Sequence, residues 1–498
     1  MNATRGALKF AVIAVLVLIA ARPAQAQTET VLYRFCYQGC SDGFGPDSSL
    51  IFDHAGNLYG TTWSGGAFEY GSVYELSPNG SGGWNETVLY SFCSAPNCAD
   101  GAQPGGPLAF DSAGNLYGIT TYGGNNDCGG ETCGVVFELS PVGGSWTETV
   151  LCSFSPGGAC DGWWPQGGVI VDPAGNLYGN SFLGAFELSP SGGGWTYQII
   201  YSSGGVSTMD AAGNLFGGTL SGVFELSPNG SGGWNPTTIY TFSSGGHGPK
   251  GSPGTLVVGQ AGNLYGTTNS GGGFRVGTVF RLSPGANGWT EQTLYSFRKA
   301  DKNGYLYYGG IVLDAAGNIY GTTAAGGEYG DGTVFELVAP TGKRAYTEKI
   351  LWSFDGCSEG CGPTTGVILD SAGNLYGTTE YGGDYQGGGV AYEVTGVPVT
   401  TTTTLTSSPN PSTYGEAVTF TAAVTSLYGA LPPNGETVSF MQGKTLLGTG
   451  TLTGGSASFS ISTLNVGTAS VSAAYGGDTS FLGSTSNTVK QKVEEAAN

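Results

Sequence analysis

Short apolar segments recur along most of the chain, and each is bounded by residues that favour turns. In one unit, apolar and aromatic residues dominate 105–111, 115–120, 135–141 and 146–154, with Gly, Pro, Asn or Ser between these segments. β-Branched and aromatic residues are enriched in all four, which is typical of strands. The pattern therefore predicts a unit of four short strands, which we name A, B, C and D in chain order.

This unit returns seven times, and its B strand begins in a nearly constant motif. AGNLYG, or a variant with one change, occupies 55–60, 113–118, 174–179, 212–217, 261–266, 316–321 and 372–377. The repeat length averages about 53 residues, in the range of propeller blades. Four consecutive strands per unit predict an all-β, seven-bladed β-propeller, because the coils of a β-helix use far fewer residues.

The order of segments at the two ends predicts how the ring closes. A D-type strand at 28–35 stands before the first A strand. The seventh unit supplies A at 366–370, B at 374–379 and C at 390–394, but no D strand follows. We expect the N-terminal strand to complete the seventh blade, which leaves no open sheet edge between the first and last blades.

The repeated motif is interpreted as a turn device. In Asp-x-Ala-Gly-Asn the carboxylate can accept backbone N–H bonds, and Gly supplies a positive φ. The fifth unit has Gly259 in place of the Asp, which argues against an obligatory metal ligand. Because antiparallel strands alternate in direction, this turn shares one face with the C-to-D turns. The D-to-A and B-to-C loops form the opposite face, which we name the loop face.

Beyond residue 399 the repeat ends and a different β pattern begins. Apolar and polar residues alternate in 417–424, 437–442, 456–462 and 469–475, at intervals of roughly 8 to 12 residues, which is typical of a β-sandwich. This part has no Cys, so an Ig-like fold here lacks the inter-sheet disulfide. We therefore expect a propeller at 27–397 followed by an Ig-like β-sandwich at 399–493.

The first 26 residues are interpreted as a cleaved signal peptide. Arg5 and Lys9 precede an apolar run, and Ala24-Gln25-Ala26 provides an A-x-A cleavage site. The run is short for a membrane span, and no later stretch is long enough to anchor the chain. The sequence predicts an exported protein, placed outside the cell, on its surface or in the periplasm, with no transmembrane segment after cleavage.

Composition narrows the choice of partners. The net charge is -20, and clusters of Lys and Arg that would neutralise phosphates are absent, so nucleic acid is excluded as a partner. An extracellular glycan or a surface protein remains as a partner class. The aromatic content of 12% supplies apolar surface for a folded core despite the 92 glycines.

Ten cysteines fall in close pairs, which favours local disulfides in an exported chain. Zinc is the alternative, but His54 and His247 lie near no pair. The predicted disulfides are Cys36/Cys40, Cys93/Cys98, Cys128/Cys133, Cys152/Cys160 and Cys357/Cys361.

The loop face carries many aromatic side chains, and flat rings beside polar groups suit sugar rings. The alternative is that they plug the channel mouth and pack the loops. The candidate ligand-binding residues are Trp63, Tyr70, Tyr122, Trp163, Trp164, Tyr307, Tyr329, Tyr381 and Tyr385. Blades three and four have very short B-to-C connections, at 182–183 and 220–221, so we expect this face to have a low side there.

Three D-to-A loops place Asp-Gly directly before strand A, at Asp42, Asp100 and Asp161. Carboxylates ringing a channel could hold Ca²⁺, the one cofactor that the sequence suggests. Asp-Gly is also a common turn pair, and this second interpretation is the simpler one.

Catalytic signals are weak, so a non-catalytic binding or adhesion protein is the favoured function. Two isolated His residues give no Ser-His-Asp set, and the one G-x-S-x-G match, at 356–360, lies between paired cysteines rather than at a strand-turn-helix elbow. Two alternatives stay open: a carbohydrate-active hydrolase or lyase that uses loop-face carboxylates, and a purely structural envelope protein.

Both parts of the chain also resemble known families. The seven GNLYGTT-type cores with VFELSP resemble the GloVer tandem repeats of exported bacterial proteins, which carry various C-terminal anchoring modules. TTTTLTSSPNPSTYGEAVTF and AAYGGDTSFLGSTS are similar to a bacterial Ig-like repeat. The resemblance implies export and a propeller-like fold, and it implies no biochemical activity. The chain ends in VEEAAN, without a recognisable sorting segment.

Overall fold

The computed structural model describes residues 27–36, 41–129, 132–242, 249–298, 309–314, 316–340, 345–383, 387–396, 398–426, 431–478 and 480–496. Several sequence predictions therefore fall outside the described residues. These are the signal peptide at 1–26, the propeller boundary at 397, and the residues Cys40, His247, Tyr307 and Tyr385.

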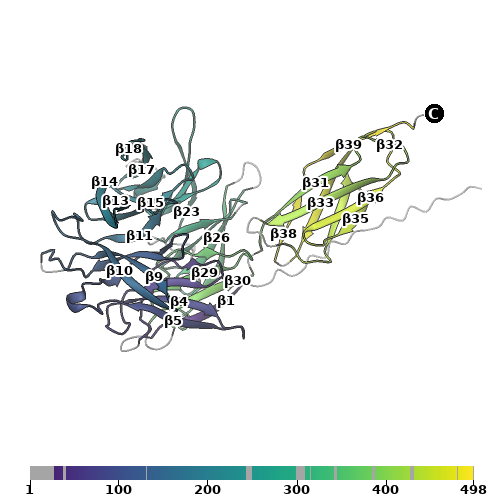
Figure 1. The fold of residues 1–498 in the computed structure, drawn as a ribbon. Helices are drawn as coiled ribbons and strands as arrows, with labels where there is room; N and C mark the ends of the chain where they lie inside the picture. The colour runs from purple at the N-terminus through teal and green to yellow at the C-terminus, as the bar shows by residue number, and fades with distance from the viewer. Residues whose placement is uncertain are drawn as a thin grey trace, which may run out of the picture.

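Seven antiparallel sheets follow one another in the propeller, each with the strand order A-B-C-D (Figure 1). Blade one comprises β2 (Ile51–Phe52), β3 (Leu58–Thr62), β4 (Ser72–Pro78) and β5 (Trp84–Ser91). Blade two comprises β6 (Ala102–Pro104) with β7 (Ala109–Phe110), β8 (Leu116–Tyr122), β9 (Val135–Val142) and β10 (Ser145–Ser153). Blade three comprises β11 (Gln166–Val171), β12 (Leu177–Ser181), β13 (Gly184–Ser191) and β14 (Gly194–Tyr201).

Blade four comprises β15 (Gly205–Met209), β16 (Leu215–Thr219), β17 (Gly222–Pro228) and β18 (Trp234–Thr241). Blade five comprises β19 (Pro249–Pro253) with β20 (Val257–Val258), β21 (Leu264–Gly271), β22 (Thr278–Ser283) and β23 (Thr290–Ser296). Blade six comprises β24 (Ile311–Leu313), β25 (Ile319–Thr323), β26 (Thr333–Val338) and β27 (Thr347–Ser353). In blades two and five the A position is divided into two short strands that both pair with strand B.

The N-terminal strand closes the ring, as predicted. Blade seven contains β28 (Ile368–Leu369), β29 (Leu375–Thr379) and β30 (Val390–Thr395), and its D position is filled by β1 (Thr28–Arg34). β1 lies antiparallel beside β30 (Figure 1), with Thr28 opposite Thr395 and Arg34 opposite Val390. The fold class predicted from the segment order is confirmed.

Alternating side chains of the B strand join neighbouring blades. Leu58 belongs to the same buried cluster as Leu50 and as Tyr376 of blade seven, whereas the next residue, Tyr59, belongs to a cluster that contains Leu116 of blade two. Successive side chains of a strand point to opposite faces, so one B strand contributes to two interfaces. Full burial of such a side chain stabilises the fold by roughly 1.5–3 kcal/mol.

The motif forms the expected turn. In blade one, Asp53 Oδ1 accepts hydrogen bonds from the backbone N of Ala55 (2.8 Å) and Asn57 (2.9 Å), and Gly56 has a φ of +88°. Asn57 Nδ2 and the Tyr59 hydroxyl donate to Asp53 Oδ2 at 2.8 and 3.2 Å. Partial burial raises the pKa of Asp53, but the hydrogen bonds from Asn57 and Ala55 outweigh it and leave the pKa below its ordinary value.

Blade five forms a related turn without the carboxylate. Gly259 stands where the other blades have Asp, and the Asn263 side chain donates to Gln260 O at 2.8 Å. Ala261 and Gly262 both have positive φ, at +57° and +71°. The backbone turn survives loss of the carboxylate, which supports the structural interpretation of the motif.

The C-terminal β domain is a sandwich of two sheets, as predicted. One contains β31 (Thr401–Ser408), β33 (Val418–Ser426) and β36 (Ser456–Ile461); the other contains β32 (Ser412–Thr413), β39 (Val489–Glu494), β37 (Gly467–Gly477), β34 (Thr437–Gln442), β35 (Thr445–Thr451) and β38 (Leu482–Thr485). Side chains such as Phe420, Phe440 and Tyr475 fill the space between them. In the part of the chain that the structure describes, no helix has the length and hydrophobicity to cross a membrane.

Candidate functional site

The D-to-A and B-to-C loops lie together on one face. At blade one, Phe44 N donates to Ser64 O at 2.8 Å and Trp63 N donates to Gly45 O at 3.0 Å, which links the two loops. At blade seven, Cys361 N donates to Tyr381 O at 2.9 Å in the same way. The two kinds of loop that strand direction assigned to one face are therefore bonded to each other at blades one and seven.

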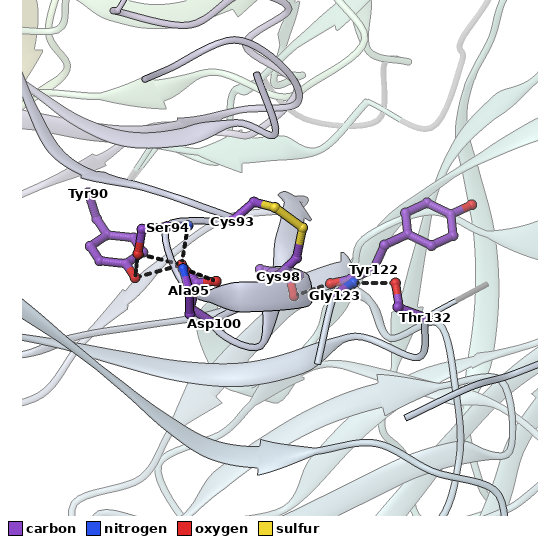
Figure 2. Close-up of a disulfide and its surroundings, with 10 residues drawn as sticks. Tyr90, Cys93, Ser94, Ala95, Cys98, Asp100, Tyr122, Gly123 and Thr132 are labelled. Atoms are coloured by element: carbon purple, nitrogen blue, oxygen red, sulfur yellow. Dashed lines mark hydrogen bonds between the residues drawn. A yellow bond between two sulfur atoms is a disulfide. The ribbon is translucent and has the colours of Figure 1, made fainter. Parts of the chain in front are cut away.

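Disulfides stiffen individual loops of this face. Bonds join Cys93 to Cys98, Cys128 to Cys133, Cys152 to Cys160, and Cys357 to Cys361. Figure 2 shows the first of these beside Asp100 and the Tyr122 strand end. The Cys36/Cys40 pair has its second member outside the described residues. Three of these bonds lie within loops and the fourth joins Cys152, in β10, to the loop that follows this strand, so the bonds are local, as the close spacing predicted.

The three Asp-Gly carboxylates accept hydrogen bonds from the preceding D strands and loops, and Asp42 Oδ1 is buried without a partner among the described residues. Asp100, a residue that is 4% exposed, accepts hydrogen bonds from Tyr90, Ser94 and Ala95, which are drawn in Figure 2. Asp42 accepts from the Tyr33 hydroxyl at 2.8 Å, and Asp161 accepts from Gly157 N at 2.6 Å.

These partners give the carboxylates a structural role. Among the described residues, no group of three or more His, Cys, Asp or Glu side chains could hold a metal ion. The placement of Asp42, Asp100 and Asp161 therefore adds nothing to the Ca²⁺ hypothesis.

One hollow of the propeller is a cavity of about 510 Å³, which we name the mouth cavity. It lies where the A strands of blades three, four and five converge, beside Phe182 of the short B-to-C turn of blade three. Its lining residues are Pro107, Trp164, Gln166, Gly167, Gly168, Val169, Ile170, Asn180, Ser181, Phe182, Gly205, Val206, Ser207, Gly218, Pro253, Gly254 and Thr255.

Aromatic rings form one rim of the mouth cavity. Phe182 is 68% exposed and stacks on Trp163, with ring centroids 5.0 Å apart and planes 22° apart. The Trp164 ring packs edge-on against the same Phe182 ring, with the two ring centroids 6.3 Å apart. The Trp164 indole N–H is buried and has no hydrogen-bond partner among the described residues. An exposed ring surface therefore stands beside the cavity.

The polar part of the lining is uncharged. Asn180 is committed to the scaffold, because its amide bonds both the N and the O of Val206, at 2.7 and 2.8 Å. The other polar side chains there are Gln166, Ser181, Ser207 and Thr255, and Ser207 Oγ accepts from Leu256 N at 3.2 Å. None of the described lining residues is Asp, Glu, His, Lys or Arg. The cavity suits a neutral polar ligand, and its lining offers no general acid or base.

A smaller hollow of about 210 Å³, which we name the seam hollow, lies where blades seven and one meet. Its lining includes Phe44, Asp47, Trp63, Glu380 and Tyr381. A hydrogen bond with Glu380, followed by burial, raises the pKa of Tyr381 to about 12. This hollow differs from the mouth cavity because carboxylates stand among its rings.

The predicted ligand-binding residues do not form one site. Trp164 lines the mouth cavity and Trp163 supports its rim, whereas Trp63 and Tyr381 line the seam hollow. Tyr122 contacts Trp63 edge-on at 6.4 Å. Tyr70 and Tyr329 are exposed and line neither hollow.

The sequence interpretation missed Phe182, Gln166, Ser207 and Thr255 as lining residues. The short turn at 182–183 was the available signal for Phe182. The other three lie at or near A strands whose convergence depends on the ring geometry.

Comparison with solved structures finds propellers at low sequence identity. The extracellular domain of a hybrid two-component system from B. thetaiotaomicron is 11% identical, with a TM-score of 0.47, and the match covers 96% of this chain and 60% of that one. The ulvan lyase of family PL25 is 11% identical, with a TM-score of 0.43 and coverage of 72% and 95%. A periplasmic gluconolactonase from Pseudomonas aeruginosa is 15% identical, with a TM-score of 0.40 and coverage of 58% and 80%.

The chain spans 59% and 60% of the length of the two sensor-type structures that it matches first. No curated protein sequence matches this chain.

Comparison with protein families gives a direct result for both parts of the chain. Residues 405–494 match the bacterial Ig-like domain (group 3). The Gloeobacter/Verrucomicrobia repeat matches residues 17–224 and 205–441, a range that contains all seven blades. With its seven motif-bearing sheets and this match over most of its length, the chain belongs to the Gloeobacter/Verrucomicrobia repeat family.

Proposed function

We propose that the protein is an exported, non-catalytic binding protein whose propeller recognises a neutral carbohydrate in the mouth cavity. The observation that carries the proposal is the combination of a hollow of about 510 Å³, an aromatic rim and uncharged polar lining. Ligand pockets commonly span about 300–1,000 Å³ and pair apolar surface with a few polar groups. Sugar rings offer apolar faces for stacking and hydroxyl groups for hydrogen bonds.

Two features define the binding mode that we propose. The stacked pair of Phe182 and Trp163 offers a ring face to the apolar side of a sugar. The uncharged polar side chains of the lining, among them Gln166, Ser181 and Ser207, offer hydrogen bonds to sugar hydroxyls. Ring surface would thus supply affinity, and the polar side chains would select for an oxygen-bearing ligand.

Export is part of the proposal and rests on the disulfides. Four bonded pairs of cysteines are typical of an oxidising compartment. The seam and mouth hollows both open on the loop face, so an exported propeller would present them to extracellular material.

A glycan array of neutral oligosaccharides, followed by calorimetry on the hits, tests this function. Phe182→Ala is expected to weaken binding about tenfold, and Gln166→Ala, which removes a polar side chain from the lining, by a similar factor. Leu220→Ala is the matched control, because Leu220 is 89% exposed in the equivalent turn of blade four but does not line the cavity.

Three outcomes would contradict the proposal. Unchanged affinity in both cavity variants would place the ligand elsewhere, and an array without hits would exclude neutral glycans. Release of reducing ends from a bound polysaccharide would favour the hydrolase or lyase alternative.

A further inference from the structure

We infer that the seam hollow is a second binding site, selective for an organic ammonium cation. It shares no lining residue with the mouth cavity, so the two sites could be occupied independently. The inference rests on the charge of the hollow, the nature of its walls and its size.

The charge comes from Asp47 and Glu380, which reach the hollow from the D-to-A loop of blade one and the B-to-C loop of blade seven. Thr364 Oγ1 donates to Asp47 Oδ1 at 3.0 Å. Within the described residues neither carboxylate forms a salt bridge with Lys or Arg. The hollow therefore holds two negative charges without a positive partner from the described part of the chain.

The carboxylates of Asp47 and Glu380 repel each other electrostatically. The Asp47 side chain reaches solvent, yet the loops around it partly desolvate its carboxylate, which raises its pKa. The Thr364 hydrogen bond lowers that pKa, and the charge of Glu380 raises it again. A cation bound between the two acids relieves this repulsion.

The walls select the kind of cation. Trp63, Tyr381 and Phe44 line the hollow, and aromatic rings attract ammonium groups through their electron-rich faces. Ca²⁺ needs about six to eight oxygen ligands, whereas the described lining offers only two carboxylates and no third metal-binding side chain. The aromatic rings and the small number of oxygen ligands together favour a methylated or alkylated ammonium group. The volume of the hollow, about 210 Å³, is enough for one such group.

Calorimetry with the mature chain tests the site, with choline chloride as the probe. Its neutral isostere, 3,3-dimethylbutan-1-ol, has the same shape without the charge. At matched ionic strength we expect choline to bind and the isostere to bind at least about tenfold more weakly. Glu380→Gln and Trp63→Leu should each weaken choline binding about tenfold.

Asp355→Asn serves as the control, because Asp355 lies exposed on a neighbouring D-to-A loop outside the hollow. Equal binding of choline and its isostere would show a merely apolar hollow and overturn the inference. Displacement of choline by Ca²⁺ at lower concentration would show an inorganic site, and that result would overturn it too. The same holds if choline fails to bind, or if Glu380→Gln, checked for folding by thermal melting, binds choline like the wild type.

Discussion

At the scale of single residues, the last Gly of the repeated motif explains why the motif tolerates so little change. A side chain at Gly118 would meet Phe137, since a Cβ there would lie 2.5 Å from the ring. The same clash recurs at Gly60 with Tyr74 and at Gly377 with Tyr392. The aromatic residue of each C strand thus occupies the space that the Gly leaves empty in strand B.

Replacing Gly118 with Ala should therefore destabilise the propeller. Overpacking a core of this density costs about 1–3 kcal/mol, because Phe137 is fully buried and has little room to move. Chemical unfolding monitored by circular dichroism measures the change.

Gly273→Ala is the control for this change. No atom lies within 4 Å of a Cβ built at Gly273, and its φ is negative or extended, so we expect a change within about 0.5 kcal/mol. Equal effects of the two substitutions would refute the packing explanation.

At the scale of elements, β1 is a full member of the ring rather than a loose terminal strand. Phe35, directly after β1, is 1% exposed and packs with Leu50 and Tyr74 of blade one. Phe35 N also donates to Gly389 O at 3.0 Å, which continues the pairing with blade seven. The N-terminal segment thereby joins two blades at once.

Phe35→Ala should cost about 3–5 kcal/mol of unfolding free energy, as expected for a buried Phe in the centre of a core. Phe68→Ala, at a loop residue that is 45% exposed, should cost far less. Denaturant titration of both variants gives the comparison. If Phe35→Ala were as mild as Phe68→Ala, β1 would not hold the ring closed in solution.

Much of this architecture could be predicted from the sequence, because each repeat carries the same pattern of strand and turn residues. Asp53, Gly56 and Asn57 specify their turn through neighbouring groups, and the missing D strand after residue 394 required the strand at 28–35. The candidate site was less predictable. Thr255 and Gln166 meet only because separate blades converge, a relation that no local pattern contains.

At the scale of the whole molecule, buried acids couple stability to pH. Burial raises the pKa of Glu86 and Glu148 to about 7, and the nearby charges of Asp42 and Asp100 add to the effect. Burial raises the pKa of Glu29 to about 8, with a further contribution from Glu359. These three groups lie on D strands of blades seven, one and two.

The free energy of unfolding should fall as pH rises from about 4.5 to about 8. In that window the folded state keeps protons that the unfolded state, with an ordinary value of 4.5, has released. The native state thus binds more protons, so increasing pH favours unfolding. Asp53 and Asp111, whose pKa values are lowered, affect the free energy of unfolding only at more acidic pH.

Urea unfolding at pH 5 and pH 8 at constant ionic strength measures this dependence. The double variant Glu86→Gln/Glu148→Gln mimics the protonated state and should flatten the profile, mainly by gaining stability at pH 8. An unchanged slope in that variant would assign the pH dependence to other groups.

The closure of the ring also has a consequence for the timing of folding. Thr395 Oγ1 donates to Thr28 O across 367 residues, so the propeller strand that is synthesised first is among the last to find its partner. Contacts between such distant parts of a chain form slowly, and unpaired strand edges expose a nascent protein to aggregation. Until β30 emerges, β1 has no C strand of its own, and completion of the propeller has to wait for synthesis of the entire repeat region.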